Sequence, residues 1–582
     1  KSKSQHLNSK SLIYNDKELD NDEEIASSFM TYFQSVYTSG DLKGDSNNCT
    51  KLRELYKGLD QLSISYIDFK EIQEAMKRLK SKKTIGPDGI PGYIIKQCKE
   101  FFILPLYILF NKAVSSCKFP TKWKITKVCP IPKSNNGRDI SNYRPISILS
   151  TFAKLFESVL YKRIESHIRI SISEYQHGFT QGRSTVTNLY TFTNYISNVM
   201  DKGGQVDVIY TDFSKAFDRV NHRKLIDKLR HLNFSPRLLV LFESYLRDRK
   251  QFIVYKGCKS NEYIQSSGVP QGSNLGPLLF TIFVNDLPSC IKNSHKLLYA
   301  DDLKIYRCIE TEIDCNKLQE DINAITEWCK NNQVDINVSK CKAISFTKRK
   351  NVIGTLYNVN ETALPFSTSI KDLGVIYDNN FTFQAHIDMI VNEANRNLGF
   401  ILRATKEFSN IRAIQSLYYA FVRSHLEYAT VIWTPNTKKQ SLQIEKIQSK
   451  FLRCLTYRQT GLYPRTEGRN ALNMNYKMLT LEQRRTLNDM VYLHKVFHNQ
   501  FACNELLSSF QINVPNRKTR IENYNFFHCK KPRTNILKKS PTWRMSETYN
   551  KISKEMILDI SDECLKMFKT KIIENVCSNG TL

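Results

Sequence analysis

Hydrophobic positions recur with a helical period in the first part of the chain. In "SISYIDFKEIQEAMKRLKSKK" they fall at Ile67, Ile72, Met76 and Leu79, which predicts an amphipathic helix. The next stretch, "TIGPDGIPG", is rich in glycine and proline, so turns are expected there. A second helix is predicted over "YIIKQCKEFFILPLYILFNKAVSS", bent at Pro105 because proline interrupts the helical hydrogen-bond ladder.

The middle of the chain changes to short apolar runs that are typical of strands. Val206–Thr211 predicts a buried strand that leads directly into a helix, and "KLLYADDLKIY" predicts two strands joined by a tight turn. A helix over "EIDCNKLQEDINAITEWCKNN" and a hairpin over "QVDINVSKCKAISFT" are expected to follow. This order of elements predicts an α+β fold with an antiparallel sheet. From about Ala385 the period becomes helical again.

The charge balance favours a polyanionic partner. The 582 residues contain 85 Lys and Arg against 56 Asp and Glu, a formal charge of +29, and nucleic acid is the first candidate for so basic a chain. Basic residues gather between Arg517 and Arg544, interleaved with Tyr524, Phe526, Phe527 and Trp543. Cations among aromatic rings suit contacts to phosphates and bases. A solvated tail would have the same composition.

Cysteine usage and hydropathy indicate the compartment. The 15 cysteines form no C-x-x-C pair, which argues against a disulfide framework or a zinc ribbon and favours a reducing environment. The apolar runs at 101–110 and 275–284 are shorter than the roughly 18 to 20 residues that span a bilayer. We therefore expect an intracellular protein of the nucleus or the cytoplasm with no membrane partner. Since Lys1 is not Met, we also expect a longer parent product.

Three carboxylates stand where strands are expected to end. Asp301 and Asp302 occupy the predicted turn, and Asp212 follows the apolar strand before it. Asp-containing turns are common, but adjacent like charges repel, and three carboxylates at strand ends suit a pair of Mg²⁺ ions. His494 and His498 lack the acid of an H-E-x-x-H pattern, so we interpret them as packing or surface residues.

Several segments resemble the motifs of reverse transcriptases. "YTDFSKAFDRV" resembles their first catalytic motif, "GVPQGSNLGPLLF" the second and "YADD" the third. "KKTIGPDGIP", "PIPKSNNGRDISNYRPISIL" and "QHGFTQGRST" are similar to finger motifs of non-LTR (LINE-like, jockey/CR1/RTE-type) retrotransposon polymerases, and "SHLEYATVIWTP" is similar to part of their thumb. The likeness extends from about Ser63 to Arg458, in the family's order.

The resemblance implies a right-hand polymerase fold of the α+β class, with an antiparallel palm sheet. It divides the chain into an N-terminal helical or finger extension (1–112), a fingers and palm domain (113–377), a helical thumb (378–460) and a basic C-terminal region (461–582). Such an enzyme copies an RNA template into DNA. It joins dNTPs to the 3′-hydroxyl of a DNA primer or of nicked target DNA, using two Mg²⁺ ions for which Mn²⁺ can substitute. The oligomeric state stays open.

The resemblance also assigns roles around the metals. Asp212, Asp301 and Asp302 would hold the two ions, and the main-chain carbonyl of Phe213 would be a further ligand. Phe217 would be an aromatic gate that excludes the ribose 2′-hydroxyl, the group that distinguishes ribonucleotides. The alternative is a core residue that packs on Phe213.

Other residues are implied to contact the nucleotide. Gln271 and the backbone at Gly272, where glycine permits a close approach, would touch the incoming nucleotide and the template. Lys133 and Arg144 would grip the triphosphate, or Lys133 would contact the template backbone instead. Lys340 would protonate the leaving pyrophosphate, although any surface lysine of a hairpin would look the same.

Departures from the family pattern are small, and two other functions stay open. Thr180 stands where a basic residue is frequent, and His177 where an aromatic residue is frequent. A group II intron maturase would share the fold, but no trailing Cys/His module is found. A polymerase-derived protein that only holds RNA would gain nothing from three clustered carboxylates. No nuclease-like His/Asp/Glu set precedes Ser63.

Overall fold

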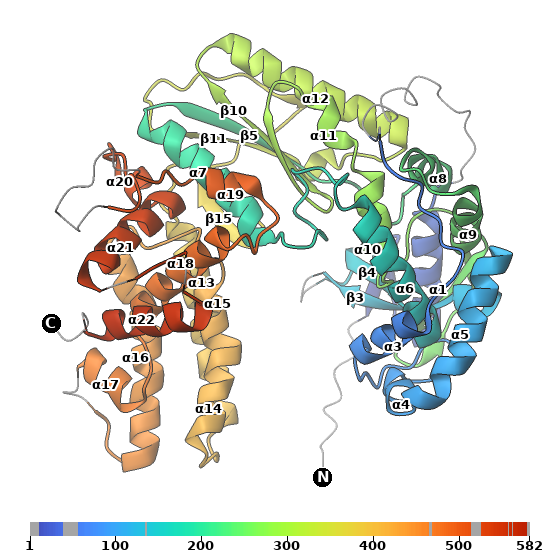
Figure 1. Cartoon of the computed structure of the whole chain (residues 1–582), viewed down its shortest axis with the longest axis horizontal. Coiled ribbons are helices and arrows are strands. Elements are labelled where there is room, and N and C mark those ends of the chain that lie inside the picture. Colours follow the sequence, from blue (N-terminus) through green and yellow to red (C-terminus); the bar gives the residue numbers. More distant parts are fainter. Residues whose placement is uncertain are drawn as a thin grey trace.

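The chain folds into an arch with two arms (Figure 1). A sheet and the long helix α12 (Glu312–Asn332) lie at the top of the arch. The N-terminal arm is defined as residues 11–168 and 213–283, and the C-terminal arm as residues 384–578. No described helix has both the length and the apolarity that crossing a membrane requires. The computed structural model describes residues 11–38, 56, 58–133, 137–464, 468–513, 525–556, 558–561 and 563–578.

A four-stranded antiparallel sheet joins the arms. Its strands are β5 (Gln205–Thr211), β9 (His295–Tyr299), β10 (Asp302–Ile309) and β11 (Lys342–Thr347), in the order β11-β5-β10-β9. β10 pairs with both β5 and β9, and β5 also pairs with β11. The antiparallel sheet and the mixture of helix and strand confirm the predicted α+β class.

The two faces of this sheet belong to two different hydrophobic cores. Because side chains alternate across a strand, Ile209 of β5 faces the core that contains α12, whereas Val206 and Val208 face the core that contains α7 (Thr185–Asp201). The first core continues into the N-terminal arm and the second into the C-terminal arm. β5 is therefore apolar on both faces, as its sequence predicts.

A five-stranded sheet organises the N-terminal arm. β3 (Ile125–Pro132) pairs antiparallel with β4 (Tyr143–Ile148) and parallel with β6 (Arg249–Tyr255). The short strands β7 (Cys258–Lys259) and β8 (Tyr263–Gln265) pair with β6. The other described α-helices and strands of this arm are β1 (Leu12–Tyr14), β2 (Lys17–Leu19), α1 (Asp22–Ser35), α3 (Phe69–Arg78), α4 (Gly92–Gln97), α5 (Lys99–Ser116), α6 (Thr151–Ile168), α8 (His222–His231), α9 (Pro236–Leu246) and α10 (Gly276–Phe283).

The C-terminal arm is helical. Its longest helix, α16 (Lys438–Thr460), begins at a capping box between Thr437 and Gln440, and Tyr418 stacks on its Phe451 with ring centroids 4.0 Å apart. The other described helices of this arm are α13 (Gln384–Ala404), α14 (Ile411–Tyr418), the π-helix η4 (Tyr419–Arg423), α15 (Ser424–Glu427), α17 (Arg469–Asn475), α18 (Leu481–Phe497), α19 (Asn504–Ser508), α20 (Asn535–Lys538), α21 (Pro541–Glu555) and α22 (Leu565–Ser578).

Short connecting elements lie between the central sheet and the C-terminal arm. The hairpin of β14 (Ser369–Asp372) and β15 (Val375–Asp378) precedes α13. β12 (Asn358–Val359) and β13 (Thr362–Ala363) form a smaller hairpin. The short helix α11 (Leu287–Cys290) packs against α12.

Three sequence predictions are wrong in detail. Only the second half of the expected hairpin at 333–347 is a strand, because Ile336 bridges to Phe213 instead of to β11. The strand β5 leads into a turn, and helix α8 starts only at His222. The single helix expected around Pro105 is two helices, α4 and α5, that meet at Cys98.

The basic segment near the C-terminus is partly described. Residues 514–524, with Tyr524 among them, lie outside the described residues. The rest of the segment includes an irregular stretch in which Phe527 is fully buried, followed by α20 and the start of α21. The described part is therefore folded, not a solvated tail.

Candidate active site

The three predicted carboxylates meet at one edge of the central sheet. Asp212 follows β5, Asp301 lies in the turn between β9 and β10, and Asp302 is the first residue of β10. Because Leu303 pairs with Thr211 in an antiparallel register, Asp302, the first residue of β10, stands opposite Asp212. The structure thus brings together residues that are about ninety positions apart in the sequence.

Electrostatic repulsion couples these carboxylates. Desolvation raises the pKa of Asp301, and the nearby Asp212 carboxylate raises it further. Desolvation and then the Asp301 carboxylate raise the pKa of Asp302 to about 6. Negative charge is therefore costly at this edge unless a cation lies close by.

Lys340 supplies one such cation. Its Nζ lies 2.9 Å from Oδ2 of Asp212, and it ends the short 3₁₀ helix Val338–Lys340 just before β11. The backbone N–H of Asn337 donates to the main-chain carbonyl of Asp212 at 2.7 Å. The segment before β11 is thus tied to the end of β5, and this places Lys340 at the carboxylates.

Lys133 and Arg144 approach the same carboxylates from the N-terminal arm. Lys133 follows β3, and Arg144 lies in β4 opposite Ile131. Desolvation lowers the pKa of Lys133, and the positive charges of Lys340 and Arg144 lower it further. The three basic side chains are therefore close enough to repel one another, beside an acidic edge.

Phe217 and Phe213 have different surroundings. The Phe217 ring stacks on Phe280, with centroids 4.3 Å apart, and meets Phe179 edge-on at 6.1 Å. Phe213 is buried and packs near Trp328 instead, at 6.5 Å. Phe217 is partly exposed and packs against the same hydrophobic core that contains Phe213, so both the gate and the core role of Phe217 stay predictions.

The loop with Gln271 and Gly272 closes against β4. The N–H of Ser147 donates to the main-chain carbonyl of Gln271 at 2.8 Å. Gly272 has a φ of +116°, and a Cβ there would lie 2.6 Å from the carbonyl oxygen of Ser147. This position needs glycine both for its backbone conformation and for the close contact.

The side chain of Gln271 is held by Asp218. Its Nε2 donates to both carboxylate oxygens of Asp218 at 3.0 Å. Burial raises the pKa of Asp218 to about 6. The sequence did not identify Asp218 as a site residue, because nothing in it beyond an acidic residue near apolar ones marks this position.

Asp218 gives a prediction about stability and pH. A buried acid with a raised pKa stabilises the fold most below its unfolded pKa of 3.8, and this contribution is lost as the pH rises through about 6. Asp218→Asn removes the effect. The stability of the wild-type protein relative to the variant should therefore fall by up to about 3 kcal/mol between pH 4 and pH 7. Urea unfolding at both pH values measures this; an equal difference at the two pH values contradicts it.

Gln176 was also missed, and it holds the turn that carries Asp301. Its Oε1 accepts hydrogen bonds from the N–H of Ala300 at 3.0 Å and of Gly178 at 2.8 Å. It is 2% exposed, and a Cβ at Gly178 would collide with the backbone of Ala300. The signal lay in the motif "QHGFTQGRST", whose glutamine and glycine build this contact.

Gln176→Leu should weaken both the fold and the site. It leaves two buried N–H groups without an acceptor, at a cost of roughly 1–3 kcal/mol each, and frees the turn that positions Asp301. We expect a lower melting temperature and a roughly tenfold lower kcat per folded molecule, with little change in KM. The matched control is Gln448→Leu, which removes a buried glutamine of the C-terminal arm and should lower stability alone. Equal effects of Gln176→Leu and Gln448→Leu on kcat would contradict the positioning role of Gln176.

The two departures from the family pattern lie next to this contact. His177 is buried, its Nδ1 lies 2.8 Å from the hydroxyl of Thr187, and burial lowers its pKa to about 3. The Thr180 hydroxyl donates to the carbonyl of Gly178 at 3.2 Å. His177 is therefore a neutral core residue.

A buried ion pair flanks the site from the C-terminal side. Lys304 of β10 pairs with Asp372 of β14, and its Nζ lies 4.3 Å from the centroid of the Phe192 ring. A cavity of about 500 Å³ runs from Asp212 and Asp302 to this hairpin. The pair joins the hairpin β14-β15 to the strand that begins at Asp302.

The side chains at this edge are of the chemical type that binds divalent ions, but they are not arranged as a complete metal site. Carboxylates are the hard oxygen ligands that Mg²⁺ prefers, and desolvation together with the neighbouring carboxylates raises the pKa values of Asp301 and Asp302. Across the described part of the chain, however, no three His, Cys, Asp or Glu side chains converge as a metal site would require. Asp212 instead pairs with Lys340.

His494 and His498 pack against each other and against the backbone. The rings of His494 and His498 stack with centroids 4.0 Å apart. The Nε2 of His494 contacts the carbonyl of Glu563 at 2.8 Å, and that of His498 the carbonyl of Ile560 at 3.0 Å. This confirms their interpretation as packing residues.

Comparison with known families identifies the class of the protein. Residues 131–394 match the family model described as reverse transcriptase (RNA-dependent DNA polymerase). This range contains the three carboxylates, Lys340 and the loop of Gln271. The chain therefore carries a reverse transcriptase domain.

Individual relatives indicate which kind of reverse transcriptase the chain resembles. The chain is 30% identical over 455 residues to the probable RNA-directed DNA polymerase from transposon BS of Drosophila melanogaster, covering 75% of this chain and 50% of that protein. It is 29% identical over 404 residues to the RNA-directed DNA polymerase from mobile element jockey of Drosophila funebris, covering 66% and 43%. Over its reverse transcriptase domain the chain is therefore similar to the polymerases of non-LTR retrotransposons, and it spans about half the length, or less, of these relatives.

Proposed function

We propose that this chain is an RNA-directed DNA polymerase that extends a primer 3′-hydroxyl with dNTPs on an RNA template. The observation that carries the proposal is the register of β5 and β10, which places Asp212 beside Asp301 and Asp302 within the matched domain. A protein that only held RNA would bind it less tightly, because these carboxylates repel the RNA phosphates.

Two Mg²⁺ ions, or Mn²⁺ in their place, would be held by Asp212, Asp301, Asp302 and the main-chain carbonyl of Phe213. Bound there, the ions would activate the primer hydroxyl and stabilise the charge on the leaving pyrophosphate. The 2.9 Å contact of Lys340 with Asp212 neutralises one carboxylate before the ions bind. Once released from Asp212, the Lys340 ammonium lies within reach of the site and can donate a proton to the pyrophosphate.

The nucleotide would lie between the carboxylates and the N-terminal arm. Arg144 and Lys133 would bind its triphosphate, since their charges already act on the acidic edge. The exposed edge of Phe217, fixed by its stack on Phe280, would exclude a ribose 2′-hydroxyl. The loop at Gly272 would line the base, with Gln271 oriented by Asp218.

The arch corresponds to a right hand under this proposal. The central sheet would be the palm, the N-terminal arm the fingers, and the helices of 378–460 the thumb, followed by the basic region 461–582. The formal charge of +29 suits a hybrid of RNA template and DNA primer. Nicked target DNA is the primer expected for an element of this family, and the nucleus or the cytoplasm is the expected compartment.

Primer extension tests the proposal. The purified chain is incubated with poly(rA)/oligo(dT), dTTP and Mg²⁺, and incorporation is followed with and without EDTA. Divalent-dependent growth of the primer is expected. A folded chain that binds the RNA but incorporates nothing would favour the RNA-holding alternative.

A further inference from the structure

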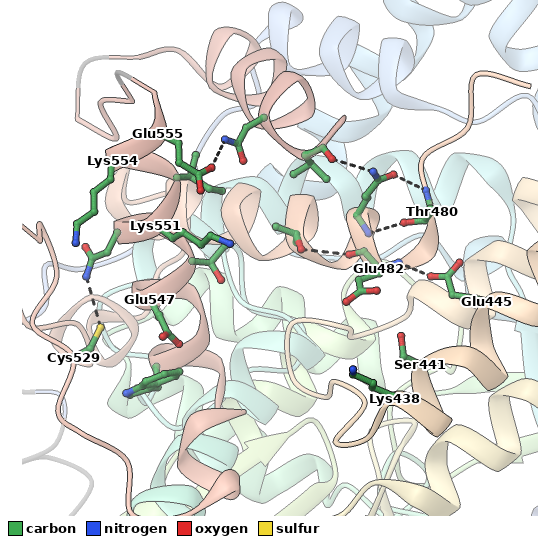
Figure 2. Close-up of a pocket in the computed structure, with 18 of the residues that line it drawn as sticks. Lys438, Ser441, Glu445, Thr480, Glu482, Cys529, Glu547, Lys551, Lys554 and Glu555 are labelled. Atoms are coloured by element: carbon green, nitrogen blue, oxygen red, sulfur yellow. Dashed lines mark hydrogen bonds between the residues drawn. The ribbon is translucent and has the colours of Figure 1, made fainter. Parts of the chain in front are cut away.

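Two cavities adjoin one another, one within the C-terminal arm and one between this arm and the end of the central sheet, and they differ in charge. The larger, of about 1450 Å³, lies between α16, α18 and α21. Figure 2 shows that Glu445, Glu482 and Glu547 face it together with Lys438 and Lys551. Acids and bases are mixed there, so this cavity does not favour a polyanion.

The smaller cavity is basic. It measures about 720 Å³ and shares Lys531, Pro532, Trp543 and Glu547 with the larger one. Glu547 is the one acid among the nine described residues that line it, against four cations. Those cations, all exposed, are Lys348, Lys531, Arg533 and Lys538. Lys348 directly follows β11 and the other three come from the C-terminal arm, so two distant segments supply positive charge to one site.

Trp543 forms an aromatic surface at this site. Its indole N–H donates to the main-chain carbonyl of Lys530 at 2.8 Å, which satisfies the polar edge of the ring. The residue stays partly exposed and lines both cavities. A ring held by its polar edge and bordered by cations offers a face on which a base can stack.

The segment that carries these cations is firmly anchored. The backbone N–H groups of Arg533 and Thr534 donate to the Asp201 carboxylate at the end of α7, at 3.0 and 2.7 Å. The Thr542 hydroxyl, next to the tryptophan, lies 2.8 Å from the hydroxyl of Tyr190 on the same helix. Helix α7 also covers the central sheet, so the site is preorganised on the scaffold of the catalytic edge.

We propose that this basic cavity binds single-stranded nucleic acid outside the catalytic edge. One base would stack on Trp543, and Lys531, Arg533 and Lys538 would contact the flanking phosphates. Aromatic stacking with cations along the backbone is how proteins hold single strands without reading their sequence. The residues involved share none with the carboxylate site, so the binding does not depend on polymerase activity.

Binding of a labelled 12-nucleotide strand tests the proposal. The full chain with Asp301→Asn is used so that no synthesis occurs, a blunt RNA–DNA hairpin first saturates duplex binding, and fluorescence anisotropy is measured with oligo(rU) and oligo(dT). Trp543→Ala should weaken binding of one or both strands by roughly 5- to 100-fold, the contribution of one stacked base. Trp543→Phe, which keeps a ring, should stay within about threefold of the parent.

The salt dependence of binding distinguishes the phosphate contacts from the stacking on Trp543. Lys531→Glu with Lys538→Glu should lower the slope of log K against log salt by roughly 1 to 2, whereas Trp543→Ala should leave the slope unchanged. The control is Lys566→Glu with Lys569→Glu, which makes the same charge change on exposed residues of α22. Unchanged affinity and slope for both strands in the Trp543 and lysine variants would overturn the proposal.

Discussion

Asp301→Asn is expected to lower deoxynucleotide incorporation by roughly 10³-fold, the scale on which enzymes depend on a single group that stabilises transition-state charge. The substitution keeps the size of the side chain but removes a carboxylate oxygen that a divalent ion needs. Because desolvation and Asp212 raise the pKa of Asp301, the neutral amide should also relieve repulsion. The variant should therefore fold at least as well as the wild type without divalent ions.

Single-turnover extension on poly(rA)/oligo(dT), together with thermal unfolding, measures both effects. Asp16→Asn is the matched control, since Asp16 is an exposed acid in the turn between β1 and β2, far along the chain from the carboxylates. It should change neither rate nor stability. If Asp301→Asn retained more than about a tenth of the wild-type rate, Asp301 could not be a metal ligand of the reaction.

Phe217→Val is expected to have the second largest effect, on the choice of sugar. Its ring is fixed on one face by Phe280 and keeps an exposed part, so a smaller side chain opens space where a ribose 2′-hydroxyl would lie. A pocket discriminates one small group by roughly 10- to 200-fold. The ratio of kcat/KM for dTTP to that for UTP should fall by about this factor, mainly through better use of UTP.

The measurement is single-nucleotide insertion with each triphosphate in turn. Phe408→Val serves as the control, because Phe408 is 49% exposed in the C-terminal arm and has no place in the proposed pocket. It should leave the ratio unchanged. Equal ratios in wild type and Phe217→Val would return Phe217 to a packing role on Phe280.

The sequence pointed to the carboxylates of the candidate site more readily than to the residues that support them. Asp212, Asp301 and Asp302 could be found because strand periodicity and a tight turn are local signals. Only the register of Leu303 on Thr211, a long-range pairing, shows that these signals converge. The α+β class followed from the same local patterns.

The supports of the site depend on contacts between distant segments. Gln176 accepts from Ala300, 124 positions away, and Asp372 pairs with Lys304 across 68 positions. No local period marks such residues. The hairpin predicted at 333–347 was wrong for the same reason. Ile336 bridges to Phe213, which lies outside the segment 333–347 on which the prediction was based.

The most direct test of the central claim is to copy an RNA of defined, mixed sequence and to sequence the product. A DNA primer is annealed to the RNA, and the chain is supplied with four dNTPs and Mg²⁺. We expect DNA complementary to the RNA, and we expect this product to be lost when Asp212, Asp301 or Asp302 is replaced by asparagine. Product that does not follow the template, or synthesis that survives those replacements, would contradict it.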